Sequence, residues 1–92
     1  MLTLISYDVP SDRRRTKLAE ALKNFGRRVQ LSVFECDVDE ERLGRLRARV
    51  VKLTVAEEDS VRIYRVCGTC REKVEVIGLG LPPQDDPEVV IL

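Results

Sequence analysis

Residues 1–10 read MLTLISYDVP, a short apolar run that ends in one carboxylate and one proline. Its apolar side chains fall on both alternation faces, with Leu2 and Leu4 on one and Ile5, Tyr7 and Val9 on the other. This is typical of a strand covered on both sides. Pro10 then ends the strand. The pattern predicts a central β-strand whose carboxyl end presents Asp8 next to the start of the following element.

The rest of the chain alternates between helical and extended patterns. Ser11 is a good N-cap, and apolar residues recur at helical spacing until Gly26, which we expect to close the helix. Residues 28–38 alternate as one long strand or as two strands sharply bent near residues 30–32. The predicted elements are a strand over 1–9, a helix over 12–25, extended structure over 28–38, a helix over 40–53, and strands over 60–66, 74–77 and 89–92.

This order of elements predicts an α+β fold, the ferredoxin-like βαββαβ sandwich, in which both helices cover one face of the sheet. The second, apolar face of the first strand then needs a partner, so we expect a two-fold homodimer formed through the sheet faces. We assign residues 1–80 to the ferredoxin-like domain and residues 81–92 to a Pro-rich linker and an additional C-terminal tail strand. An apolar tail strand of this kind should pair with a sheet edge.

The composition indicates one globular domain with unevenly distributed charge. The 92 residues are 43% hydrophobic and 35% charged, and the formal net charge is zero. Residues 11–30 nevertheless hold seven basic and two acidic residues, whereas residues 31–60 hold eight acidic and five basic ones. Such segregation can present a basic surface to a phosphate backbone. Because neither a signal peptide nor a long apolar run is present, we expect a cytoplasmic protein with no membrane partner.

Asp8 is the sharpest candidate for chemistry. The chain contains no histidine, so hydrolysis would have to use carboxylates, tyrosine or lysine together with a hard metal ion. Mg²⁺ or another divalent cation binds one or two carboxylates together with water and phosphate oxygens, and a dimer axis would bring two copies of Asp8 together. A metal held in this way could activate water for phosphodiester cleavage. The alternative is that Asp8 merely caps the helix or pairs with a nearby arginine.

Basic residues surround this point in the sequence. Cations at a helix start oppose the helix dipole, so their clustering indicates an anionic partner, either Asp8 or a ligand. Arginine matches phosphate oxygens bidentately. The candidate nucleic-acid contacts are Arg13, Arg14, Arg15, Lys17, Arg27 and Arg28. A solvated charge run is the alternative interpretation.

The cysteines and aromatic residues give weaker signals. Cys67 and Cys70 form a C-x-x-C pair, but three cysteines without histidine are too few for a structural zinc site. A redox dithiol would be expected to open a helix, a context the pattern does not indicate, so the thiols are interpreted as structural or incidental. Phe34 falls in a strand alternation typical of the core, whereas Tyr7, next to Asp8, is kept as a functional aromatic residue.

Taken together, these segments resemble the small CRISPR-associated adaptation proteins of the Cas2 family. The resemblance rests on Tyr7-Asp8-Val9, on Arg14-Arg15, on residues 22–26, and on residues 28–35, RVQLSVFE, which are similar to the family's Q-x-S-V-F-E segment. Residues 60–64 followed by a cysteine fit as well. The resemblance covers residues 1 to about 78.

The resemblance implies a ferredoxin-like homodimer in which two Asp8 side chains face each other and bind a divalent metal. It implies a magnesium-dependent endonuclease for RNA or DNA, acting in antiviral defence, and a bridge between dimers of the Cas1 integrase during spacer acquisition, with duplex DNA held by its backbone. It assigns catalysis to Asp8 and Tyr7 and nucleic-acid contacts to Arg15, Arg28 and Phe34, and it places a meeting of two strands at residues 30–32. A non-catalytic DNA-binding scaffold is the main alternative, and a small-molecule regulatory domain is a third.

Overall fold

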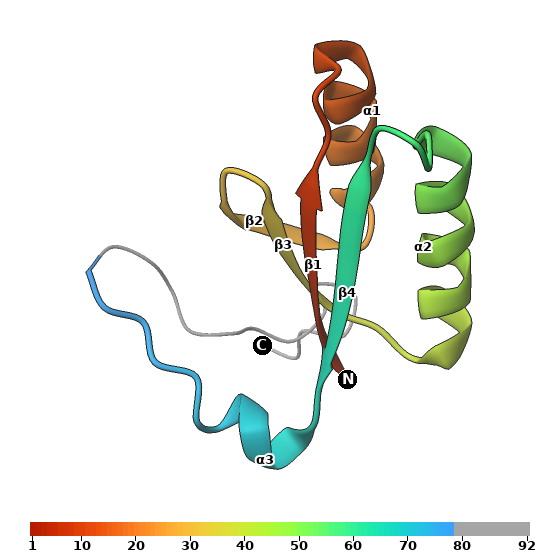
Figure 1. Cartoon of the computed structure of the whole chain (residues 1–92). Helices are drawn as coiled ribbons and strands as arrows, with labels where there is room; N and C mark the ends of the chain where they lie inside the picture. The colour runs from red at the N-terminus through yellow and green to blue at the C-terminus, as the bar shows by residue number, and fades with distance from the viewer. Residues whose placement is uncertain (79–92) are drawn as a thin grey trace.

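The computed structural model describes residues 1–78, which form a four-stranded antiparallel sheet with two helices packed on one face (Figure 1). The elements are β1 (Leu2–Asp8), α1 (Asp12–Leu22), β2 (Gly26–Gln30), β3 (Val33–Asp37), α2 (Glu40–Leu53), β4 (Ser60–Val66) and the short α3 (Gly68–Arg71). The strand order is β2-β3-β1-β4. The predicted ferredoxin-like α+β fold is confirmed. The domain boundary at residue 80 and the predicted tail strand over 89–92 lie outside the described residues.

β1 is the central strand, as the opening sequence predicts. It pairs with β3 and β4, and its register places Ile5 opposite both Phe34 and Ile63. Ile5, Phe34 and Leu18 are completely buried between the sheet and the helices. Burial of side chains this size stabilises the fold by about 1.5–3 kcal/mol each. β1 is therefore held on both edges and on its helix-covered face, and Asp8 stands at the end of a rigid element.

Both long helices start at side-chain caps. The Ser11 hydroxyl accepts a hydrogen bond from the Arg14 backbone N–H, and the Asp39 carboxylate accepts one from the Arg42 N–H. α2 keeps the predicted bounds of 40–53, and its apolar stripe packs Leu43, Leu46 and Val50 against the sheet. No helix within residues 1–78 has both the length and the apolar character needed to span a membrane.

The end of α1 differs from the prediction. The helix stops at Leu22, residues 23–25 form a turn, and Gly26 begins β2 instead of capping the helix. A Cβ on Gly26 would lie 2.1 Å from the Glu35 carbonyl oxygen and 2.7 Å from the Cys36 Cα. Glycine is therefore required here because β2 and β3 approach so closely.

Residues 28–38 contain the sharp bend that was one of two alternatives. β2 and β3 form an antiparallel hairpin whose register shifts between Arg28 and Gln30, and residues 31 and 32 form the turn. The Tyr7 N–H donates to the Ser32 carbonyl oxygen at 3.1 Å. This bond fixes the hairpin turn beside the carboxyl end of β1.

The predicted strand over residues 74–77 is wrong, because these residues pair with none of the strands in the described part of the chain. α3 turns the chain away from the sheet after β4 and sends residues 72–78 along the side opposite α2 (Figure 1). Ile77 is 92% exposed there. The alternation of valine and isoleucine thus lacks a neighbouring strand among residues 1–78.

Candidate functional site

Asp8 is an exposed carboxylate set between two buried residues. Tyr7 is 4% and Val9 2% exposed, whereas Asp8 faces solvent at the last position of β1, opposite Ser60 of β4. Packing on both sides fixes the backbone of Asp8 without covering its side chain. An ordered backbone with an accessible carboxylate is the arrangement that a ligand-binding residue needs.

A cavity of about 510 Å³ opens beside Asp8, between the end of β1, α1 and the hairpin turn of β2 and β3. We call this cavity the Asp8 groove. Its charged lining consists of Asp8, Glu20, Arg15, Lys23 and Arg28. Three cations against two carboxylates give the groove a positive lining that suits an anionic ligand.

Arg15 is held at the rim of the Asp8 groove by its own neighbours. Its guanidinium donates to the Val9 carbonyl oxygen at 2.9 Å and also contacts the Asp12 carboxylate. The side chain is still 41% exposed. Arg15 is therefore positioned next to the end of β1 with N–H groups open to solvent.

Arg28 reaches the groove from β2. Its guanidinium carbon lies 5.6 Å from the centroid of the Phe34 ring, a cation–π arrangement. Phe34 is completely buried and lies 6.3 Å from the Tyr7 ring, with the two rings stacked. Phe34 therefore has no exposed surface for stacking on a base, and its place in the site is to support Arg28.

The structure places Tyr7 in the core instead of at the surface beside Asp8. Its hydroxyl is buried and has no hydrogen-bond partner among residues 1–78. The ring packs on Phe34, and the backbone N–H binds the hairpin turn. Tyr7 thus fixes the position of Asp8, and this placement does not offer its hydroxyl to a substrate.

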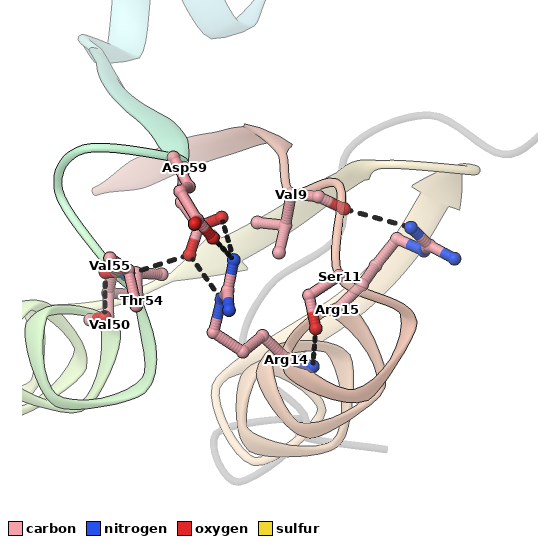
Figure 2. A network of polar contacts seen from close by, with 9 residues as sticks. Val9, Ser11, Arg14, Arg15, Val50, Thr54, Val55 and Asp59 are labelled. Atoms are coloured by element: carbon pink, nitrogen blue, oxygen red, sulfur yellow. Dashed lines mark hydrogen bonds and ion pairs between the residues drawn. The ribbon is translucent and has the colours of Figure 1, made fainter.

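Arg14 faces away from the groove, contrary to its prediction as a nucleic-acid contact. Its guanidinium binds both carboxylate oxygens of Asp59, at 2.9 and 3.0 Å, and lies 2.6 Å from Glu58. The Asp59 side chain is 1% exposed and also accepts the Val55 N–H at 2.8 Å. Figure 2 shows Arg14 and Arg15 directed to opposite sides of α1. We call the Arg14, Glu58 and Asp59 set the Arg14 bridge.

The remaining predicted cations do not gather at the Asp8 groove. Arg13 and Lys17 are exposed on α1, and neither lines the groove. Arg27 has its guanidinium 3.6 Å from the Glu35 carboxylate and lines a second cavity, of about 600 Å³, on the sheet face opposite the helices. The predicted basic ridge therefore divides, and only Arg15 and Arg28 of the predicted set stand beside Asp8.

Sequence reasoning missed Lys23, Glu20 and the hairpin turn as parts of the groove. The Lys23 ammonium group, in the turn just after α1, lies 3.0 Å from the Glu20 carboxylate, and both residues line the groove. Leu31, at the hairpin turn, is 84% exposed and lines the same cavity. No local signal could have indicated Leu31, because in the sequence it belongs to the strand alternation of residues 28–38 and its exposure follows from the hairpin turn.

The potential metal ligands are few. No group of three or more Cys, Asp or Glu side chains gathers into a metal-binding set within residues 1–78. Asp8 is a single carboxylate, which matches the one or two carboxylates that Mg²⁺ uses along with water.

Comparisons with known proteins identify relatives over nearly the whole chain. Residues 1–74 match the family described as CRISPR associated protein Cas2. The chain is 45% identical, over all of both sequences, to a protein of Chloroflexus aurantiacus named CRISPR-associated endoribonuclease Cas2 1. It is 49% identical to a CRISPR-associated endonuclease Cas2 2 of Thermus thermophilus, covering 90% of this chain and 88% of the relative.

Solved structures agree with these relatives. The hypothetical protein TT1823 of Thermus thermophilus matches with a TM-score of 0.80 and 49% identity, over 90% of this chain and 96% of that one. A chain of a partial Cas6-RT-Cas1--Cas2 complex matches with a TM-score of 0.76 and 28% identity, over 99% and 98% of the two chains. Family profile, sequence and fold coincide, and the chain therefore belongs to the Cas2 family of CRISPR-associated proteins.

Proposed function

We propose that this protein binds nucleic acid through the Asp8 groove and cleaves phosphodiester bonds there with the help of Mg²⁺ or another divalent cation. Family membership supports the proposal, since several relatives are named endoribonucleases or endonucleases. The observation that carries it is the exposed Asp8 carboxylate sharing one cavity with Arg15, Lys23 and Arg28. This combination offers a metal ligand and phosphate contacts within one groove.

Asp8 would hold the metal ion, which would supply Lewis-acid activation of water and stabilisation of charge on the phosphate. Asp8 is suited to this role because it is exposed at the end of a rigid strand. Arg15 and Arg28 would bind phosphate oxygens on either side of the scissile bond. Because both guanidiniums are already held, by Val9 and by the Phe34 ring, little side-chain entropy would be lost on binding.

The active unit would be a homodimer in which a second copy covers the open face of the sheet. Leu4 and Val33 are half-buried on that face, and Tyr64 is 46% exposed. These residues line the second cavity with Val74, Val76 and Ile77. Two facing sheets would bury this apolar surface and could bring the two Asp8 carboxylates near one axis. Like charges at such an axis repel, so a divalent cation would stabilise the pair.

The wider role we propose is in spacer acquisition during CRISPR antiviral defence, with the Cas1 integrase as partner. A neighbouring solved structure is titled as a complex that includes Cas1 and Cas2. In such an assembly the protein could hold duplex DNA without cutting it. The small number of carboxylates beside Asp8 favours this second function, a non-catalytic scaffold, because the groove would then act through its cations alone.

The test of the catalytic function is an Asp8→Asn variant assayed for Mg²⁺-dependent cleavage of RNA and DNA. We expect a loss of about 100-fold or more, the typical size for removing a group that acts in the chemical step. Glu57→Gln, which makes the same carboxylate-to-amide change on the exposed 56–58 turn, should cleave like the wild type. If Asp8→Asn cleaves as fast as Glu57→Gln and the wild type, Asp8 takes no part in cleavage.

A second arm separates the scaffold from the nuclease. The wild type and Asp8→Asn are each mixed with duplex DNA and the Cas1 integrase, and assembly, integration and cutting are scored together. If Asp8→Asn assembles and supports integration like the wild type, the nuclease function is not needed for spacer acquisition. If neither protein binds duplex DNA at low salt, the scaffold function is excluded.

A further inference from the structure

Cys67 and Cys70 occupy the start of α3, at the junction between the sheet and residues 72–78. Both thiols are exposed, whereas Cys36, the remaining cysteine, is 1% exposed in the core. Neither Cys67 nor Cys70 lines the Asp8 groove or the cavity on the open sheet face. An inference about this pair therefore does not depend on the proposed function.

The structure supplies the helical context that the sequence pattern did not indicate. Cys67 is the N-cap of α3, with an extended backbone (φ −66°, ψ 165°), and Cys70 lies one turn further on. The Cys67 carbonyl oxygen accepts the Arg71 N–H at 2.8 Å, which closes this turn. Residues three apart across a helical turn are neighbours, and the non-helical cap residue leaves the Cys67 side chain free to approach Cys70.

The two thiols differ in acidity. The backbone N–H and the thiol of Cys70 stabilise the Cys67 thiolate and lower the pKa of Cys67. The same contact raises the pKa of Cys70. By contrast, burial raises the pKa of Cys36 to about 12. An exposed low-pKa thiol beside a second thiol is the arrangement of an attacking and a resolving cysteine.

We propose that Cys67 and Cys70 form a reversible dithiol–disulfide site that exchanges with low-molecular-weight disulfides of the glutathione class. The Cys67 thiolate attacks one sulfur of the oxidised disulfide, forms a mixed disulfide and releases one small thiolate. The Cys70 thiolate then attacks the Cys67 sulfur, closes the Cys67–Cys70 bond and releases the second small thiolate. The protein loses two electrons and two protons, which the two released thiols gain, so that reduced glutathione reverses the reaction.

A redox site fits better than a metal site in this part of the chain. No third Cys, Asp or Glu joins the pair to make a metal-binding group within residues 1–78. A structural zinc ion needs four such ligands. The dithiol thus has the exposure and spacing for exchange chemistry but not the ligand number for zinc.

The site would act on the connection between β4 and residues 72–78. α3 is attached to the sheet through Arg71, whose guanidinium lies 3.5 Å from Asp37, and Asp37 also binds the N-terminal ammonium group at 3.0 Å. A Cys67–Cys70 bond would make the first turn of α3 rigid, directly before the Arg71–Asp37 ion pair in the sequence. Oxidation would therefore restrict the path that residues 72–78 take from α3 along the open sheet face.

The test is a titration of the purified full-length protein with mixtures of reduced and oxidised glutathione, followed by alkylation and mass spectrometry. We expect one reversible transition in which Cys67 and Cys70 are protected together, with loss of two hydrogens, while Cys36 stays reduced. Disulfides between chains, independent glutathione adducts on both cysteines, or tight zinc binding with one ion shared by two chains would each overturn the proposal.

Single-cysteine variants separate the two roles. Cys70→Ser should retain a stable glutathione adduct on Cys67, because the resolving thiol is absent. Cys67→Ser should react about tenfold more slowly at neutral pH, since Cys70 lacks the backbone N–H donors that lower the pKa of Cys67. Equal rates for the two variants would contradict the assignment of Cys67 as the attacking thiol. Both substitutions are at exposed positions, and the wild-type titration tests the site without any substitution.

Discussion

Arg14 and Arg15 are adjacent in the sequence, but their environments in the structure are opposite. Arg14 binds a carboxylate that is 1% exposed and connects α1 to the loop before β4. Arg15 turns to the other side of the helix, donates to the Val9 carbonyl oxygen and lines the Asp8 groove (Figure 2). Adjacent arginines in a basic cluster can therefore differ in role: Arg14 pairs with a buried carboxylate, whereas Arg15 pairs with the exposed Asp12 and keeps part of its side chain in solvent.

The largest expected effect is a loss of stability on substitution of Gly26, in the hairpin that brings Arg28 to the Asp8 groove. Gly26→Ala would place a methyl group 2.1 Å from the Glu35 carbonyl oxygen, where backbone and not a flexible side chain must move. We expect the free energy of unfolding to fall by about 3 kcal/mol. Urea denaturation measures this change. A loss below about 1 kcal/mol would show that β2 and β3 can move apart easily, so that their close approach at Gly26 does not require glycine.

Gly44→Ala is the matched control for this substitution. Gly44 is an exposed residue within α2, and a Cβ there would meet no atom within 4 Å. Alanine should therefore raise the free energy of unfolding by roughly 0.5–1 kcal/mol, because it lowers the backbone entropy of the unfolded chain. If both alanine variants lose stability to the same extent, the steric explanation for Gly26 is wrong.

The next effect concerns the pH dependence of the Arg14 bridge. The hydrogen bond from Arg14 lowers the pKa of Asp59 below its ordinary value. A carboxyl group with a lower pKa in the folded state contributes its full stabilisation above the unfolded value of about 3.9, and this is lost as the pH falls through the folded pKa. Asp59→Asn should therefore be less stable than the wild type at pH 7, and the difference should shrink below about pH 4.

Thermal denaturation from pH 7 to pH 2.5 would measure this difference, with Glu57→Gln as the control acid in the same loop. Glu57 is exposed and makes no contact with Arg14 among the ion pairs of residues 1–78. A constant difference between Asp59→Asn and wild type across the pH range would mean that the bridge stabilises the fold by packing and not through the charge on Asp59.

Much of the fold could be predicted from sequence, because local signals specify it. The bounds of α2 and β4 follow from the Asp39 cap, the apolar stripe of the helix and the alternation of residues 60–66. The end of α1 could not be predicted, because Gly26 also fits a helix cap and its real constraint, Glu35, lies on another strand. Residues 74–77 have a strand pattern but lack a neighbouring strand within the described residues.

The candidate site was predictable to a smaller extent. Asp8 followed from the end of an apolar strand, and Arg15 and Arg28 from their positive charge. Arg14 lies outside the Asp8 groove because it binds Asp59, which is 45 residues away in the sequence. The supporting position of Phe34 depends on its register opposite Arg28 across the hairpin. The sequence thus shows which residues are charged, whereas the tertiary structure is needed to show which charges pair.

The most direct measurement compares Arg14→Gln with Arg28→Gln in two assays, thermal denaturation and binding to duplex DNA over a range of salt concentrations. The comparison is made at a temperature at which circular dichroism shows both variants folded. We expect Arg14→Gln to lower the unfolding temperature and to leave the salt dependence of binding unchanged. Arg28→Gln should lower the unfolding temperature less than Arg14→Gln does, since it removes one cation–π contact of an exposed side chain. It should reduce the slope of log affinity against log salt by about 1 and weaken binding about fivefold near 0.15 M salt. The opposite result, weaker DNA binding by Arg14→Gln and unchanged binding by Arg28→Gln, would contradict the division of the basic cluster into a structural bridge and a nucleic-acid groove.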